Sequence, residues 1–151
     1  MTTQFGDLQR LHLAVQQQMD VVVFTVLGHD AGAQTMTRLY SSHPREFEVG
    51  DTKRTDRGVS PEWVTACLAG QEPHLASTAA DVARIFTDFR LIYSLGCGSC
   101  INAPVIHEGM TLGVLNILGP ENAYGQREVQ AAARLASQSV MAVQWAHGTR
   151  P

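Results

Sequence analysis

The stretch GCGSCINAPVIHEGMTLGVLNILG, residues 96–119, decides the fold. It holds two apolar runs, residues 100–106 and 111–118, separated by His107, Glu108 and Gly109. β-Branched and aliphatic side chains dominate both runs, which is typical of a β-hairpin with a short glycine-bearing turn. Both runs are apolar nearly throughout, so we expect both faces of this sheet to be covered.

The segment before this hairpin predicts a helix and a second hairpin. Apolar residues recur at helical spacing from Phe5 to Met19 and indicate a helix over residues 3–18. Residues 20–28 are dense in β-branched residues, and residues 34–42 follow a turn at residues 29–32, so the two predict an antiparallel pair. Strict alternation in the second strand places Arg38, Tyr40 and Ser42 on one face.

The middle of the chain predicts a long surface loop and two short helices. Residues 43–58 are polar, with prolines and glycines, and loops of this length in compact domains are often functional. Ser60 and Pro61 favour the start of a helix over residues 61–69, and Ser77 or Thr78 can cap a helix through Ile85. Residues 89–95 are ambiguous between a strand and an extended loop. Residues 126–147 predict one long final helix.

These elements predict an α+β fold in one domain, residues 1–151. A central antiparallel β-sheet carries the N- and C-terminal helices on one face and the loops and short helices on the other. The concavity between the sheet and those loops is where a small ligand is expected to bind.

Composition limits the class of function. The 151 residues are 44% hydrophobic and 17% charged, with a net charge of −3, so no basic surface predicts nucleic-acid binding. No apolar run is long enough to cross a membrane, and the N-terminus does not resemble a signal peptide. Three cysteines, an odd number, do not form a disulfide framework, so we expect a cytoplasmic protein with reduced thiols.

Four motifs resemble the GAF domain family: RLYSSHP at 38–44, FTD at 86–88, LGCGSCINAPV at 95–105 and GMTLGVLNILG at 109–119. The likeness is to small bacterial proteins made of one GAF domain and little else. It implies the GAF-like fold and a small-molecule-binding or sensor role in signal transduction. GAF domains bind cyclic nucleotides, bilins, haem or small metabolites, and the resemblance assigns no particular ligand or cofactor here. A signal is then expected to leave through dimerisation or a partner chain.

Cys97 and Cys100 form a CxxC motif that leads into a strand, whereas a redox-active CxxC works best at a helix N-terminus. No second CxxC or paired Cys/His motif completes a metal site. One related family, the free methionine-(R)-sulfoxide reductases, uses loop cysteines, and Cys67, Cys97 and Cys100 lie in comparable segments. Their pattern does not match that family, so a thiol-dependent enzyme remains the alternative to a non-enzymatic protein, and no catalytic residue is assigned.

The candidate ligand-binding residues combine aromatic walls with a few hydrogen-bonding groups. They are Tyr40, Ser42, Trp63, Tyr93, Cys97, Ser99 and Asn102. Lys53 and Arg54 can meet an anionic ligand if their loop closes over the sheet. The competing interpretation is that these are core residues with satisfied polar tips, in a structural dimerisation module whose pocket has collapsed.

The terminal helices carry more apolar surface than one sheet face needs. On the last helix a stripe through Val129, Ala136 and Val143 faces the sheet, which leaves Leu135, Ala142 and Trp145 off the stripe; on the first helix Leu13 is left. We therefore expect a homodimer through the terminal helices.

Overall fold

The central hairpin forms as the sequence predicts. The computed structural model describes residues 3–148, and in it β5 (Ser99–His107) pairs antiparallel with β6 (Met110–Gly119). Glu108 and Gly109 make the turn with φ angles of 51° and 77°. Two successive positive φ angles match the right-handed twist of the flanking strands, and glycine adopts the second without strain.

The hairpin occupies the middle of one antiparallel sheet. The strand order is β3-β2-β1-β6-β5-β4. Val23, Thr25 and Leu27 of β1 share one face with alternate residues of β5 and β6, and Phe24 and Val26 point to the other. The remaining strands are β1 (Val23–Asp30), β2 (Thr35–Ser41), β3 (Thr52–Arg54) and β4 (His74–Ala76). The short strand β3 lies inside the segment predicted to be an irregular loop.

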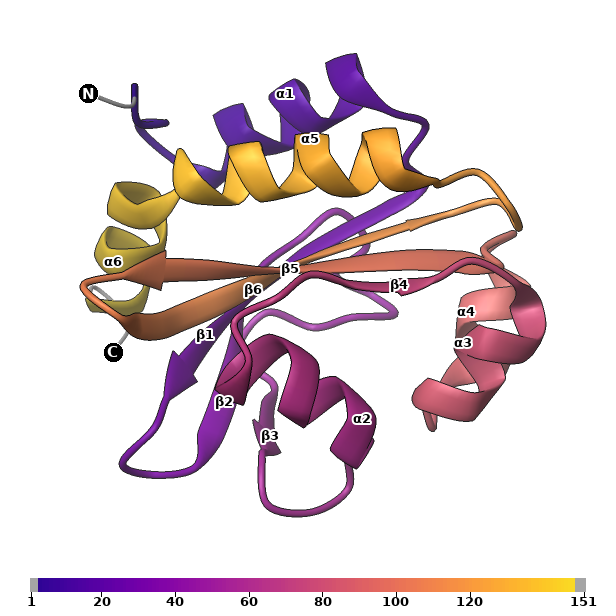
Figure 1. Cartoon of the computed structure of the whole chain (residues 1–151), viewed down its shortest axis with the longest axis horizontal. Helices are drawn as coiled ribbons and strands as arrows, with labels where there is room; N and C mark the ends of the chain where they lie inside the picture. The colour runs from indigo at the N-terminus through magenta and orange to yellow at the C-terminus, as the bar shows by residue number, and fades with distance from the viewer. Residues whose placement is uncertain (1–2, 149–151) are drawn as a thin grey trace.

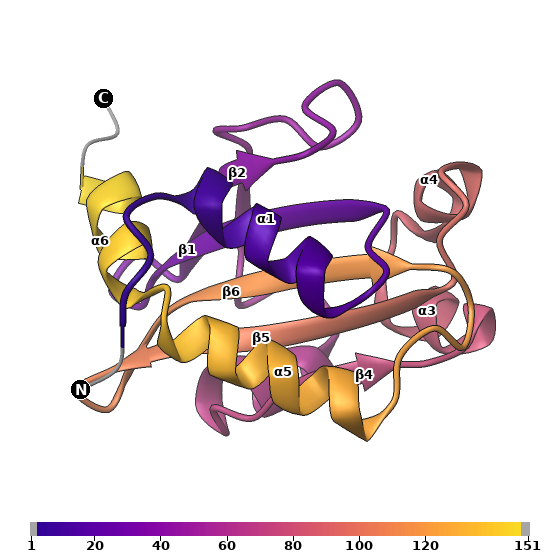
Figure 2. The ribbon, with the colours of Figure 1, turned by 90° about the horizontal axis from the view of Figure 1, so that it is seen from above.

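The terminal helices cover one face of the sheet (Figure 1). Helices α1 (Leu8–Gln18) and α5 (Gln126–Ser137) lie side by side across it, and α6 (Val140–Gly148) covers one end (Figure 2). Helix α1 starts later than predicted because the Asp7 carboxylate caps it, accepting a hydrogen bond from the Arg10 amide at 2.9 Å.

The predicted single C-terminal helix is in fact two. The chain breaks between α5 and α6 at Gln138 and Ser139, where the buried Ser139 hydroxyl donates to the Ala136 carbonyl at 2.8 Å. A serine side chain that bonds a nearby carbonyl competes with the helical pattern, which favours a helix end. The break lets α6 turn across the end of the sheet (Figure 2).

The opposite face is covered by short helices beneath the sheet (Figure 1). Residues 89–95, ambiguous in the sequence, form a helix, because the Phe89 ring and its neighbours pack against the apolar residues of α3 and of the sheet. The elements are α2 (Pro61–Trp63), the π-helix η1 (Val64–Ala69), α3 (Ala79–Ile85) and α4 (Phe89–Ser94). Thr78 caps α3 with a capping box to Asp81, as predicted.

The largest apolar core lies between the sheet and the terminal helices. Leu135 and Ala142 belong to it and are 6% and 2% exposed, so they are not available for a dimer contact as the sequence suggested. The rotation of α6 at the break buries Ala142 and leaves Met141 and Trp145 exposed at 61% and 68%.

Leu135→Glu is therefore expected to unfold the protein rather than to dissociate a dimer. The substitution buries an unpaired charge between α5 and the sheet, and the free energy of unfolding should fall by more than about 3 kcal/mol. Gln17→Glu on the neighbouring helix α1 is the control, since Gln17 is exposed and the change should stay within about 0.5 kcal/mol. Urea unfolding of both variants measures the difference, and equal stabilities would contradict this packing.

Candidate functional site

A cavity of about 70 Å³ lies between the sheet and the short helices that cover it. Its lining comes from strands β1, β2, β3, β5 and β6, the loop before α2, and the segment from the end of α3 into α4. The lining residues are Val23, Thr25, Leu27, Met36, Arg38, Phe47, Lys53, Gly58, Val59, Ser60, Trp63, Ile85, Phe86, Thr87, Asp88, Ile92, Cys100, Asn102, Asn116 and Leu118.

The cavity floor is a row of polar side chains across three strands. Asn102 of β5 pairs with Asn116 of β6, which pairs in turn with Thr25 of β1. The Asn102 amide donates to Asn116 Oδ1 at 2.7 Å, and the Asn116 amide donates to the Thr25 hydroxyl at 3.0 Å. We call these three residues the asparagine ladder. All are buried, and Asn102 Oδ1 has no hydrogen-bond partner.

One wall carries a buried arginine. Arg38 is 5% exposed, and its Nη1 donates to the Glu48 carbonyl at 3.2 Å and to Asp51 Oδ2 at 3.3 Å. Its guanidinium lies 5.4 Å from the centre of the Phe47 ring. Burial lowers the Arg38 pKa, and the carboxylates of Asp51 and Asp88 oppose that shift. Within residues 3–148 the Arg38 Nε has no hydrogen-bond partner, so this side chain can donate to a further acceptor.

A second cation lies beside it. Lys53 stands opposite Met36 in the β2–β3 register and is partly buried. The ion pairs among residues 3–148 do not include Lys53. Burial is the main cause that lowers its pKa, the charge of Arg38 adds to that shift, and Asp88 opposes it. The cavity therefore holds two cationic side chains and the Asp88 carboxylate.

A β-bulge in β2 aims Arg38 at the cavity. Val26 pairs with Tyr40, whereas Leu27 pairs with Arg38, so Leu39 is an extra residue in β2. The extra residue reverses the alternation, and Arg38 and Tyr40 point to opposite faces. The expectation that Arg38, Tyr40 and Ser42 share one face is corrected for this reason.

The lid over the cavity is built by residues 58–60 and by Trp63 of α2, and the π-helix η1 continues from α2 over the neighbouring part of the sheet. Trp63 is 5% exposed, and its Nε1 has no hydrogen-bond partner among residues 3–148. In η1 the Gly70 amide donates to the Thr65 carbonyl, five residues back, at 2.7 Å. The wider π turn is often found at functional sites. It seats the Cys67 thiol over the sheet, 3.7 Å from the Asn102 carbonyl oxygen.

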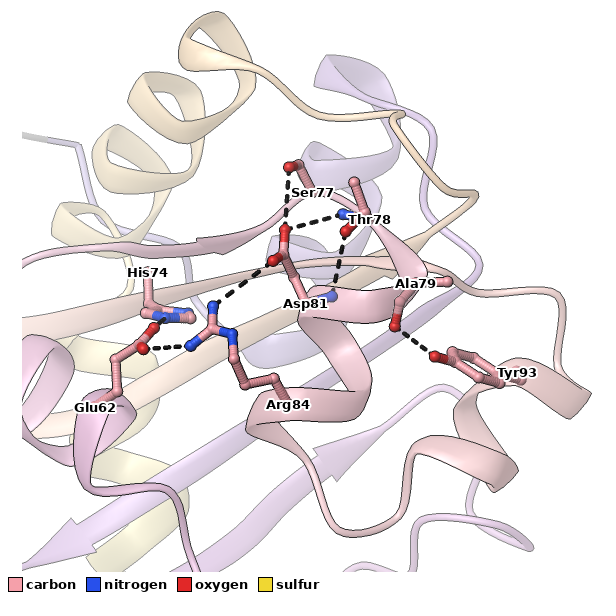
Figure 3. Close-up of polar contacts among 8 residues, drawn as sticks. All are labelled: Glu62, His74, Ser77, Thr78, Ala79, Asp81, Arg84 and Tyr93. Atoms are coloured by element: carbon pink, nitrogen blue, oxygen red, sulfur yellow. Dashed lines mark hydrogen bonds and ion pairs between the residues drawn. The ribbon is translucent and has the colours of Figure 1, made fainter.

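A polar clasp of Glu62, His74 and Arg84 ties the lid to its neighbours (Figure 3). His74 Nε2 of β4 lies 2.8 Å from one carboxylate oxygen of Glu62 in α2, and Arg84 of α3 bonds the other oxygen. Arg84 also lies 3.6 Å from Asp81. The hydrogen bond from His74, followed by that from Arg84, lowers the Glu62 pKa. The clasp thus connects α2 and α3, which both contribute to the cavity lining, with the edge strand β4.

The structure brings only two of the seven candidate ligand-binding residues to the cavity, Trp63 and Asn102. Tyr40 lies under α1, where its hydroxyl shares a hydrogen bond with His12 at 2.8 Å, and the Ser42 hydroxyl accepts from the Phe24 amide at 2.9 Å. Tyr93 is exposed and its hydroxyl donates to the Ala79 carbonyl (Figure 3). Cys97 and Ser99 are buried beyond the cavity lining.

Sequence reasoning missed Arg38, Asn116 and Asp88 as site residues. A signal existed for two of them, because a charged residue within a predicted strand and an asparagine within an apolar strand both need a partner when buried. Lys53, flagged as a possible anion contact, lines the cavity, whereas its neighbour Arg54 is exposed and pairs with Asp56 at 2.8 Å.

The three thiols are free and buried. Burial raises the pKa of Cys67 to about 12 and of Cys97 to about 11, and it also raises the Cys100 pKa. A nucleophilic cysteine needs the opposite shift and access to its substrate. The arrangement therefore disfavours thiol chemistry.

Residues 3–148 lack two kinds of feature. They contain no cluster of three or more His, Cys, Asp or Glu side chains suited to holding a metal ion. None of their helices has both the length and the apolar character that crossing a bilayer requires.

The fold described above is that of a known family of sensory domains. The family model of the GAF domain matches residues 8–143, so the chain belongs to the GAF domain family. GAF domains are sensory and ligand-binding modules of signalling proteins. No curated protein matches this chain.

Solved structures share the fold at low sequence identity. The GAF domain of a two-component sensor histidine kinase from Bacillus halodurans is 13% identical, with a TM-score of 0.72 over 93% of this chain and 92% of that one. The GAF domain/HD domain protein from Geobacter sulfurreducens is 11% identical, with a TM-score of 0.73 over 93% and 91%. The GAF domain of an Acinetobacter phosphoenolpyruvate-protein phosphotransferase is 15% identical, with a TM-score of 0.63 over 95% and 96%. These likenesses show the fold alone.

The buried thiols predict how stability depends on pH. Burial in the folded protein keeps the Cys67 thiol neutral. Its contribution to the free energy of unfolding is therefore complete below the thiol pKa of the unfolded chain, near 9.0, and is lost as the pH rises toward the folded-state pKa of about 12. Between pH 9 and 11 the stability of Cys67→Ala should therefore fall less steeply than that of the wild type, by up to about 1.4 kcal/mol per pH unit. Urea titrations across this range measure it. Identical slopes, or rapid alkylation of the folded protein at pH 7, would show that the thiol is accessible.

Proposed function

We propose that this chain is a GAF-domain sensor that binds a small molecule in the cavity under residues 58–60 and α2. The observation that supports this most is the set of buried polar atoms without partners on residues lining the cavity: Arg38 Nε, Trp63 Nε1 and Asn102 Oδ1. Each such group costs about 1–3 kcal/mol when left unpaired. A purely structural module gains nothing from this cost, whereas a ligand can supply the missing partners.

The size of the cavity favours a small metabolite. Pockets for drug-sized ligands measure about 300–1,000 Å³, and this cavity measures about 70 Å³. A bilin, a haem or a cyclic nucleotide exceeds that space while the clasp holds α2 against β4 and α3. A molecule of a few heavy atoms fits with the lid closed.

Output through a homodimer is the second part of the proposal. On α6, Met141 and Trp145 are four residues apart and therefore share one face, and both are exposed, as is Leu13 on α1. Self-association through these terminal helices would cover that apolar surface. Three free cysteines fit a reducing compartment, so we place the protein in the cytoplasm.

The ligand site is tested by blocking the cavity. Val59 lines the cavity, and Val59→Trp should fill it. Val49→Trp, in the loop before β3, is the control, because Val49 is 46% exposed and outside the lining. Thermal-shift screening against a panel of small neutral, cationic and anionic metabolites should find compounds that stabilise the wild type and Val49→Trp but not Val59→Trp. At 100 times its Kd a ligand adds about 2.7 kcal/mol. Compounds that stabilise all three proteins equally would place the site elsewhere.

The dimer is tested by sedimentation at micromolar concentration. We expect a dimer for the wild type and a monomer for Trp145→Glu, since a stable interface buries about 1,000 Å² or more and does not tolerate a central unpaired charge. Ala80→Glu adds the same charge at an exposed position of α3, on the other face of the sheet, and should remain dimeric. A monomeric wild type refutes this part of the proposal without touching the ligand site.

A further inference from the structure

The charges that line the cavity favour an anion. Arg38 and Lys53 are cations on adjacent strands of the same sheet face, and Asp88 is the only carboxylate in the lining. Asp51 pairs with Arg38 at 3.3 Å from outside the lining, and it is more than half exposed, so contact with solvent weakens this pair. The lining therefore carries one net positive charge, which a single negative charge balances.

Hydrogen-bond donors without an acceptor also line the cavity. Arg38 Nε and Trp63 Nε1 are both donors, and neither has a hydrogen-bond partner within residues 3–148. The ammonium group of Lys53 forms no ion pair within residues 3–148. An oxyanion accepts several hydrogen bonds at once, and charge-assisted bonds of this kind are about twice as strong as neutral ones.

Apolar side chains also line the cavity, beside the polar residues of its floor. Val23 and Leu118 from the sheet face Phe86 and Ile92 from the segment that covers it. These side chains cannot donate hydrogen bonds to the oxygens of an inorganic oxyanion, but they can pack against an alkyl group of an organic one. For comparison, a cavity of roughly 150 Å³ holds benzene, so a cavity of about 70 Å³ takes a ligand smaller than that.

We propose that the ligand is a small aliphatic monocarboxylate, with its carboxylate toward Arg38 and Lys53 and its alkyl group toward Val23, Phe86 and Ile92. This deepens the proposed function and depends on the cavity being the ligand site. A dianion such as phosphate leaves an uncompensated charge in the cavity. An α-amino acid of the same length adds an ammonium group to a lining that already holds two cations.

Propionate is the probe, and the two tryptophans give a residue-specific readout. In ¹H–¹⁵N spectra of the wild type, saturable addition of propionate should shift the Trp63 indole resonance as its N–H gains an acceptor, and should leave the Trp145 resonance in place. Formate, which lacks the alkyl group, and propionamide, which lacks the charge, should each bind at least tenfold more weakly.

Lys53→Met removes the cation and should preserve the fold. The partly buried lysine forms no ion pair within residues 3–148, and methionine is an apolar side chain of similar length. The substitution should weaken propionate binding at least tenfold while the melting temperature stays at or above that of the wild type. Arg54→Met, on the same strand but outside the cavity, should bind propionate as the wild type does.

Tighter binding of alanine or inorganic phosphate than of propionate would overturn the monocarboxylate assignment. Unchanged propionate affinity in Lys53→Met would overturn it too. If only neutral compounds stabilise the protein, and Val59→Trp abolishes their effect, the inference fails while the proposed ligand site stands. If Val59→Trp changes the binding of no compound, the proposed function fails as well.

Discussion

The register between β5 and β6 is the constraint on which the rest of the structure depends. Pairing Asn102 with Asn116 directs every apolar residue of one face toward α1 and α5, and directs the asparagine ladder into the cavity. A slip of one residue in either strand would move the asparagine of that strand into the apolar core and turn its core side chains toward the polar cavity. The two-residue turn at Glu108 and Gly109 and the hydrogen bond between the asparagines both favour the native register.

The two faces of the sheet serve different purposes. The helix-covered face holds the largest apolar core, and it supplies most of the burial that stabilises the domain. The other face has smaller apolar clusters, split by the cavity, and is held together by the clasp and by the loop around Arg38. Local stability varies within one fold, and ligand-binding segments belong to its less stable parts. We infer that the face with the cavity is the less stable of the two.

Sequence patterns predicted the elements whose signal is local. The β1–β2 and β5–β6 hairpins, the cap at Thr78 and the presence of α1, α2, α3 and α5 follow from periodicity and turn chemistry. The short strands β3 and β4 and the helix α4 were not predicted, and α6 was predicted as part of α5. Tyr40 was misplaced because a bulge at Leu39 reverses the alternation, and no residue in that strand signals the bulge. Ala142 was misjudged because the helix break at Ser139 changes which residues of α6 face the sheet, and only tertiary packing selects that break over a continuous helix. Leu135 was misjudged because the buried stripe of α5 is wider than predicted and includes Leu135 beside Ala132 and Ala136. The cavity unites Arg38 with residues from distant segments, which single-strand patterns do not reveal.

Hydrogen exchange of the full chain, with and without saturating propionate, tests most directly the claim that a ligand binds between the sheet and the lid. The account predicts slower exchange in residues 58–63, 85–88 and 36–38, which surround the cavity, and unchanged exchange in α5 and α6. Protection confined to α1, α5 and α6, with none around the cavity, would contradict it.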